Sequence, residues 1–193
     1  MRRHIPNLIS SLRLVCAAAS VVVVATGGTR AWFLGLLAAA LLSDAVDGYL
    51  ARRLHAASDL GRRLDSWGDY AVLSAAAYGL WMLWPDLVHR EIRWLIAGLT
   101  SCYAIVIYGL VRWSRILAFH TMASKALAVA LPLALAVLLA GWSAVPIHVV
   151  VALQLVGAVE ELAIAFVLPG FSGEMPSLWH AVRRRRQGSI NRT

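Results

Sequence analysis

Residues 41–70 read LLSDAVDGYLARRLHAASDLGRRLDSWGDY, and four of the five aspartates in this stretch lie at the facing ends of two apolar runs. Asp44 and Asp47 close the first run, and Asp65 and Asp69 open the second. A carboxylate in or near hydrocarbon is costly unless it is paired, hydrated or bound to a cation. Four converging carboxylates also repel one another, and a divalent cation is the simplest way to hold them together. The stretch therefore predicts a metal site at the edge of a membrane.

The composition agrees with a chain that lies in lipid. Of the 193 residues, 60% are hydrophobic and 15% are charged, whereas soluble domains have about 25% charged residues. The net charge of +8 includes the run Arg183–Arg186 after the last apolar stretch, which suits anionic lipid headgroups. We expect no nucleic-acid partner, because no aromatic and basic recognition module appears. Cys16 and Cys102 lie inside apolar runs and are expected to be buried thiols.

The apolar runs predict an all-α polytopic membrane protein. They lack the alternation of barrel strands, and each is close to the roughly 20 residues that span a bilayer as a helix. We expect a bundle of six transmembrane helices with a polar active-site cavity on the cytoplasmic side, in a single domain over residues 1–193. Its core covers about 6–170, followed by a basic cytoplasmic tail at 171–193. The predicted helices are 8–26, 31–54, 63–84, 93–113, 121–140 and 144–168.

The basic residues predict the orientation. With a cytoplasmic N-terminus, most arginines and lysines fall on the cytoplasmic side, and the opposite side holds only Arg30, Arg90 and Arg93. Both aspartate pairs and both termini then face the cytoplasm, and we expect the bacterial inner (plasma) membrane. Arg13, near the cytoplasmic end of the first helix, is expected to snorkel toward the headgroups.

The spacing of the aspartates indicates one shared site. Asp44 and Asp47 are three residues apart, and Asp65 and Asp69 are four apart, so each pair lies on one face of a helix. The connection between the two helices is short, which makes them antiparallel neighbours whose carboxylates can face each other. Oxygen ligands favour Mg²⁺ or Mn²⁺ over zinc. Four carboxylates can hold two ions, a device that recurs in displacement at phosphorus.

Residues between the two pairs fit a phosphate-bearing substrate. Gly48 and Ala51 keep one helix face small, so that a bulky ligand can lie against it. Arg52 offers a fork for phosphate or ribose oxygens, and Gly61 eases the turn into the next helix. Taken alone, Gly48 and Ala51 would be explained better by close helix packing. Beside four carboxylates, a ligand site is the better interpretation.

The stretch from Asp44 to Asp69 resembles the signature of the CDP-alcohol phosphotransferase (CDP-alcohol phosphatidyltransferase) family, D-x2-D-G-x2-A-R-x8-G-x3-D-x3-D. All fixed positions match with unbroken spacing. At background frequencies of about 5% per residue, a chance match at one start position has a probability on the order of 10⁻¹⁰. The signature is therefore specific, although it covers a small part of the chain.

The resemblance implies an integral membrane enzyme that transfers a phosphatidyl group from CDP-diacylglycerol to a small alcohol and releases CMP. It also implies a homodimer. Asp44, Asp47 and Asp65 would bind Mg²⁺ or Mn²⁺, with Asp69 as a further ligand or the general base. The residues expected to line the CDP site are Asp44, Gly48, Ala51, Arg52, Gly61 and Asp65.

The acceptor is indicated only by short features. Residues 6–13, PNLISSLR, resemble a stretch common among family members that use glycerol-3-phosphate. Those members usually have proline and lysine where this chain has Ser66 and Tyr70. Serine, inositol phosphate and phosphatidylglycerol therefore stay open as acceptors. Basic residues around the ends of the fourth and fifth helices are candidates for binding an acceptor phosphate, or else topology determinants: Arg112, Arg115, His120 and Lys125.

Two other classes of protein fit the acidic residues less well. A cation transporter would place carboxylates at several depths along a pore, whereas these four gather at one level. A catalytically silent partner protein would not need the complete set. In the sixth helix, Glu160 and Glu161 are expected to be structural, and His148 and Gln154 to have hydrogen-bond partners within the bundle.

Overall fold

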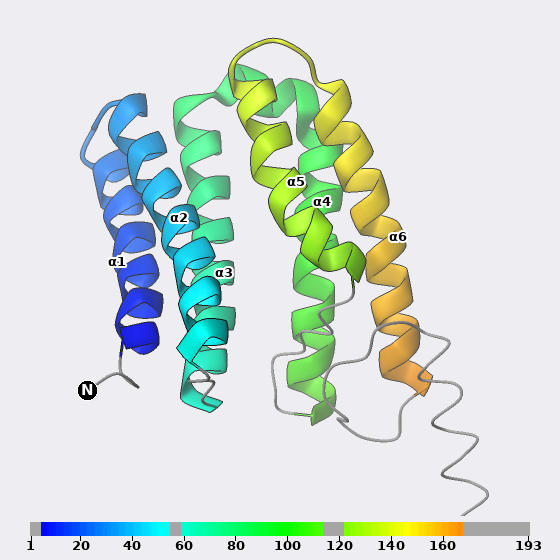
Figure 1. Cartoon of the computed structure of the whole chain (residues 1–193). Coiled ribbons are helices and arrows are strands. Elements are labelled where there is room, and N and C mark those ends of the chain that lie inside the picture. Colours follow the sequence, from blue (N-terminus) through cyan, green and yellow to red (C-terminus); the bar gives the residue numbers. More distant parts are fainter. Residues whose placement is uncertain (1–4, 55–58, 114–121, 168–193) are drawn as a thin grey trace, which may run out of the picture. The chain divides into compact units, whose positions relative to one another are not determined.

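The described part of the chain forms α-helices only, in a computed structural model. Its backbone is described for residues 5–54, 59–113 and 122–167, and side chains are described within these ranges except at 5–10, 45, 47–54, 59–65, 113, 122–125 and 167. Six helices lie in these ranges (Figure 1). They are α1 (Ile5–Ala25), α2 (Arg30–Leu54), α3 (Asp59–Leu83), α4 (Pro85–Trp113), α5 (Met122–Leu139) and α6 (Val145–Val167).

The number of helices predicted from the sequence is confirmed within the described residues, but two of the predicted beginnings are wrong. α3 begins at Asp59 and α4 at Pro85, both earlier than expected. Proline suits the first position of a helix, where its missing N–H is not needed. Asp86 in the first turn of α4 complements the helix dipole. Residues 85–92, which the predicted helices leave out, therefore form the first turns of α4.

Two glycines end helices as the sequence predicts. Gly27 has φ 77° and Gly141 has φ 73°, a left-handed conformation that glycine adopts at little cost. After α1, the amide of Gly28 donates to the carbonyl of Val23 at 2.7 Å, and that of Gly27 to Val24 at 3.2 Å. This is the Schellman pattern of hydrogen bonds. It closes α1 and turns the chain into α2.

Contacts between helices divide the chain into two compact units, residues 1–90 and 91–193. In the first unit, α1 packs against both α2 and α3. The N-terminal end of α1, the C-terminal end of α2 and the N-terminal end of α3 lie at the same end of this unit (Figure 1). The aspartate-bearing parts of α2 and α3 therefore point toward a common end.

One face of α1 forms the centre of the first unit. Arg13, Ala17, Ser20 and Val24 are all buried, and their spacing of three or four residues places them in one stripe along the helix. The hydroxyl of Ser20 donates to the carbonyl of Ala17 at 2.7 Å, which satisfies it within its own helix. Arg13 is thus part of the buried stripe.

Close packing between α2 and α3 depends on a glycine. A Cβ atom at Gly79 would lie 2.1 Å from Cζ of Phe33, and Phe33 is 1% exposed. At the end of the unit away from the aspartates, Nη2 of Arg30 donates to the carbonyl of Leu83 at 2.6 Å. The Arg30 guanidinium also lies 4.9 Å from the ring centroid of Trp84. These contacts join the start of α2 to the end of α3.

In the second unit, polar side chains join α4 to α6. Nε2 of His148 and Oε2 of Glu91 lie 2.7 Å apart, and the His148 ring stacks on Trp94 with centroids 4.6 Å apart. The amide of Gln154 donates to the carbonyl of Gly98 at 2.9 Å. The expectation that His148 and Gln154 have partners within the bundle is confirmed. Glu161 is buried in α6.

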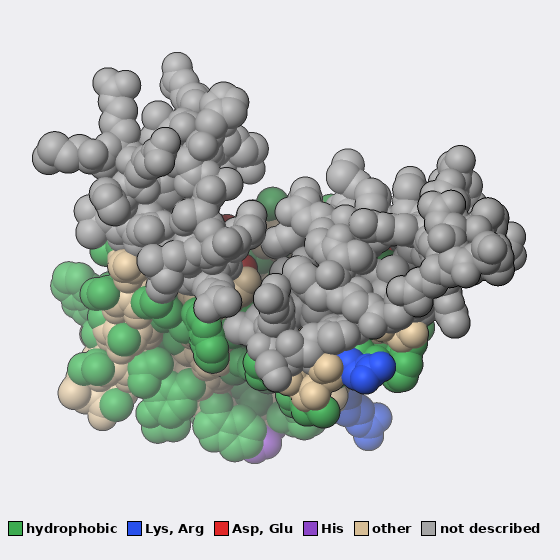
Figure 2. Space-filling view, turned by 90° about the horizontal axis from the view of Figure 1, so that it is seen from below, with side chains coloured by type: hydrophobic (Ala, Val, Ile, Leu, Met, Phe, Trp, Pro, Cys, Tyr) green, Lys and Arg blue, Asp and Glu red, His purple; other side chains and the backbone are tan. Residues whose placement is uncertain are grey.

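Two helices of the described residues, Pro85–Arg112 and Val145–Phe166, are long and apolar enough to cross a membrane by length and composition. Ser11–Ala25 and Ala126–Leu139 are shorter apolar helices. Large hydrophobic side chains such as Val111 are exposed, and the coloured surface in Figure 2 is mostly hydrophobic. Extended apolar surface of this kind is typical of a membrane or an interface.

Candidate active site

The backbone brings both aspartate pairs to the same end of the first unit (Figure 1). Asp44 lies ten residues before the end of α2, and Asp69 ten residues after the start of α3. At 1.5 Å per residue, both helices continue about 15 Å beyond these aspartates. Asp47 and Asp65 follow on the same helices toward that end, and their side chains lie outside the described part. Most side chains that would line the predicted polar cavity belong to residues 45–65 and lie outside the described part.

Arg13 of α1 joins the first and last of the four aspartates. Its Nη1 donates to Oδ1 of Asp69 at 2.8 Å, and its Nη2 donates to Oδ1 of Asp44. The Arg13 side chain is 1% exposed, whereas those of Asp44 and Asp69 are 52% and 57% exposed. One guanidinium therefore holds two carboxylates from the buried side and leaves them accessible from the other.

The expectation that Arg13 snorkels to the headgroups is wrong. Arg13 lies on the same stripe of α1 as Ala17 and Ser20, and this stripe faces α2 and α3. A buried guanidinium requires anionic or carbonyl partners, and the two aspartates supply them. Charge-assisted hydrogen bonds of this kind are stronger than neutral ones. The signal in the sequence was the spacing of Arg13 from the buried small residues of α1.

Gly68 makes room for this arginine. A Cβ atom at Gly68 would lie 2.9 Å from Cδ and 3.4 Å from Nη1 of Arg13. Gly68 directly precedes Asp69, so the guanidinium passes across the α3 backbone to reach the carboxylate. Gly68 occupies a variable position of the signature, yet in this chain its small size leaves space for the Arg13 side chain.

The donor set fits a hard divalent cation. The four carboxylates and one guanidinium give a formal local charge of −3 (−4 + 1). Asp44 and Asp69 are brought together with more than half of each side chain exposed, and carboxylate oxygens are the ligands that Mg²⁺ and Mn²⁺ prefer. Among the described side chains, no three metal-ligating groups cluster; those of Asp47 and Asp65 are not in that set.

The other predicted site residues divide between the two units. Gly48, Ala51 and Arg52 lie in the last turns of α2 and Gly61 in the first turn of α3, with side chains outside the described part. The proposed acceptor residues belong to the second unit or its connections. Arg112 is exposed in the last turn of α4, Lys125 lies in the first turn of α5, and Arg115 and His120 lie outside the described residues.

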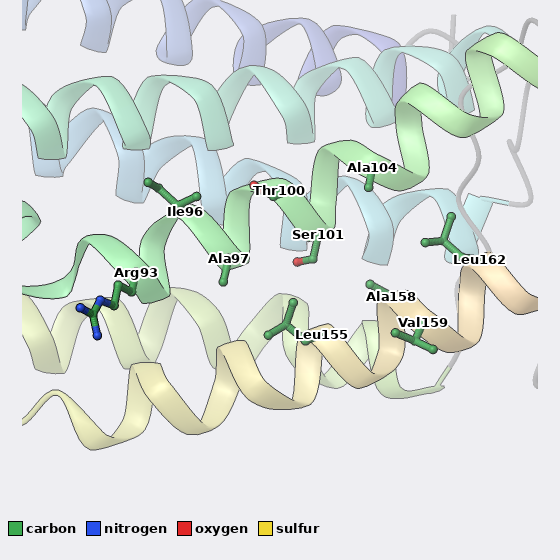
Figure 3. A pocket seen from close by; sticks show the side chains of 10 residues that line it. All are labelled: Arg93, Ile96, Ala97, Thr100, Ser101, Ala104, Leu155, Ala158, Val159 and Leu162. Carbon is green, nitrogen blue, oxygen red and sulfur yellow. The ribbon is translucent and has the colours of Figure 1, made fainter.

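The second unit contains a separate groove of about 380 Å³ between α4 and α6. Figure 3 shows Arg93 at one end and Leu162 at the other. The groove contains no carboxylate, so it does not supply the acid–base or metal-binding groups of the aspartate site. Its lining residues are Arg93, Ile96, Ala97, Thr100, Ser101, Ala104, Leu155, Ala158, Val159 and Leu162.

Comparison with known proteins agrees with the signature. The family model for CDP-alcohol phosphatidyltransferase matches residues 3–167, a range that contains all six described helices. No curated protein and no solved structure gives a significant match to the chain. Members of this family are membrane-associated transferases that generally depend on a divalent metal, and they transfer a phosphatidyl group from a CDP-alcohol to an acceptor. The chain therefore belongs to the CDP-alcohol phosphatidyltransferase family.

Proposed function

We propose that this chain transfers the phosphatidyl group of CDP-diacylglycerol to glycerol-3-phosphate and releases CMP. One observation carries the assignment of the active site: Arg13 brings Asp44 and Asp69, the two ends of the signature, to one place. The family match supports the reaction class. The stretch at residues 6–13 supports the acceptor. Ser66 and Tyr70 keep serine, inositol phosphate and phosphatidylglycerol as alternative acceptors.

The proposed reaction is a displacement at phosphorus. The acceptor hydroxyl oxygen forms a bond to the phosphorus that carries the diacylglycerol, and the bond from that phosphorus to the bridging oxygen breaks. The bridging oxygen leaves with CMP and keeps the bonding electron pair. Asp69, which is 57% exposed on its side chain, accepts the proton of the acceptor hydroxyl, as a carboxylate within reach of that group can do.

We propose that two Mg²⁺ or Mn²⁺ ions bind to Asp44, Asp47, Asp65 and Asp69. Bound cations would neutralise the pyrophosphate and the developing charge on CMP. Gly48 and Ala51 would leave space for the nucleotide along α2, with Gly61 opposite on α3. Arg52 would bind phosphate or ribose oxygens. The proposed acceptor-binding residues are Arg112, Arg115, His120 and Lys125.

The proposed setting is a single-domain homodimer in the bacterial inner membrane. All six helices would span the bilayer, and the aspartates and both termini would face the cytoplasm. The distribution of basic residues supports this orientation. The diacylglycerol chains would then remain among lipids while the headgroup reacts beside α2 and α3.

The test is CMP release by the purified full chain from CDP-diacylglycerol with Mg²⁺ or Mn²⁺. The panel of acceptors is glycerol-3-phosphate, serine, inositol, inositol phosphate and phosphatidylglycerol. We expect release with glycerol-3-phosphate that stops with EDTA. Release with another member of the panel would change the acceptor and keep the reaction. Absence of release with all of them, in a protein that still binds CDP, would contradict the proposed donor and acceptor.

A further inference from the structure

We propose that Arg13 is a positioning residue of the active site, which fixes the carboxylates of Asp44 and Asp69 relative to each other. The inference rests on the proposed function, because it concerns the same aspartates. It adds a residue of α1 to a site whose fixed signature positions all lie on α2 and α3. Each aspartate accepts a hydrogen bond from a different terminal nitrogen of one guanidinium.

The geometry limits where these carboxylates can go. The guanidinium is planar, and its two terminal nitrogens point in fixed directions. Because the Arg13 side chain is 1% exposed, its own position is held by the surrounding helices. An Oδ1 atom of each aspartate is therefore held from the buried side, and cation or substrate must approach from the exposed side.

Gly68 provides a second and independent observation. The α3 backbone approaches Arg13 so closely that a Cβ atom at residue 68 would lie 2.9 Å from Cδ. The helix thus gives space to the arginine at the residue before Asp69. If Arg13 extended to the lipid headgroups instead, it would not need the space that Gly68 leaves beside α3.

Arg13→Met removes the charge and keeps most of the side-chain length, and Arg13→Lys keeps the charge but replaces the fork with one ammonium group. Arg30→Met is the matched control, because Arg30 also joins α2 to α3 in this unit, at the end away from the aspartates. The first readout is Mn²⁺ affinity, measured by electron paramagnetic resonance on the full chain in micelles. Loss of a group that orients metal ligands typically weakens metal binding by about 10–100-fold.

We expect such weakening for Arg13→Met and little change for Arg30→Met. Unchanged Mn²⁺ affinity in Arg13→Met would overturn the inference, and so would tighter binding, which would make Arg13 a competing charge. If Arg13→Met does not fold, Arg13→Lys decides. For Arg13→Lys we expect a midpoint of thermal unfolding near that of the wild type. We also expect weaker Mn²⁺ binding and a kcat at least about 10-fold lower than in the wild type. A purely structural role predicts that kcat recovers together with the midpoint.

The inference and the proposed function can fail separately. A wild-type chain that binds Mn²⁺ but releases no CMP would contradict the function, while the effect of Arg13→Met on Mn²⁺ would still decide the inference. Conversely, an active wild-type enzyme whose Mn²⁺ affinity and kcat are the same in Arg13→Lys would overturn the inference and leave the function standing.

Discussion

Single side chains at the active site have separable tasks. Asp44 and Asp69 both contact Arg13, yet only Asp69 is proposed to take a proton. The signature predicted both aspartates from the sequence alone. It could not predict their shared partner, because Arg13 is more than thirty residues away along the chain and an arginine near a helix end ordinarily reaches water.

Asp69→Asn tests the proton acceptor. The amide keeps the size of the side chain and an oxygen that can accept from Arg13, but it cannot take the acceptor's proton. We expect kcat for CMP release to fall by about 10²–10⁴-fold, with the KM for the CDP-lipid within a few-fold of the wild type. Full turnover in this variant would remove Asp69 from the proton-transfer step.

Asp44→Ala tests the metal ligand, with Asp65→Ala as its counterpart on α3. Each change removes two of the oxygens that would hold the cations, and Asp44→Ala also removes a partner of the buried Arg13. We expect weaker Mn²⁺ binding in both and a lower thermal midpoint in Asp44→Ala, because a buried charge left with fewer partners is destabilising. Mn²⁺ titration of the purified variants measures this. Wild-type affinity in both would refute the ligand assignment.

Gly68→Ala asks whether the space beside Arg13 is needed. The added methyl group would lie 3.4 Å from the nitrogen that donates to Asp69 and closer still to Cδ, so the guanidinium must shift. We expect a fall in kcat of about 10-fold or more, the size of effect that loss of an orienting group produces. Gly35→Ala is the control, since nothing lies within 4 Å of its added Cβ atom. Equal activity of the two variants would argue against a steric role for Gly68.

At the level of the helices, the sequence predicted six helices, as observed within the described residues, but some of the predicted helix boundaries were wrong. Gly27 and Gly141 end helices where expected, because their left-handed conformation can be anticipated from glycine after an apolar run. The start of α4 was missed, because the predicted fourth helix begins at Arg93, whereas α4 begins at Pro85 and includes the charged residues in between. In the fold, Glu91 is buried and lies 2.7 Å from His148 of α6. A partner distant in sequence thus allows the helix to continue through charged residues.

Gly79→Ala tests the contact between α2 and α3. A methyl group there would overlap the buried ring of Phe33, and overpacking of a core typically costs about 1–3 kcal/mol. We expect a lower thermal midpoint in micelles. Combining Gly79→Ala with Phe33→Leu should recover part of the loss if the clash is its cause. A double variant no more stable than Gly79→Ala would place the cause elsewhere.

For the whole molecule, the family and its reaction class followed from the signature, which the family model confirms over residues 3–167. The six membrane crossings remain a prediction, since two helices of the described residues meet the length and composition expected of a span. Charged turns at the ends of α2 and α3 lower the apolar content of those helices. A membrane-spanning helix that carries active-site charges, as proposed for α2 and α3, therefore has a composition similar to that of a helix on the membrane surface.

Reporter fusions test the orientation of the whole chain. We expect a reporter that is active only outside the cytoplasm to be active when fused after Gly28 or Trp142, the connections after α1 and α5. It should be inactive after Leu54 or Trp113, where α2 and α4 end. Strong basic bias on one side of a membrane protein sets this orientation. The reverse pattern of activity would invert the topology and place the aspartates outside the cytoplasm.

The buried position of Arg13 has a consequence for how the chain is made. During synthesis α1 leaves the ribosome before α2 and α3, so its arginine reaches the translocon without the two aspartates. An arginine at the centre of an inserting helix costs about 2.5–3.5 kcal/mol on insertion scales, and a position nearer the end of the helix, as here, lowers that penalty. Asp44 arrives with α2 and Asp69 with α3, so both hydrogen-bond partners of Arg13 are present only after the third helix has been made.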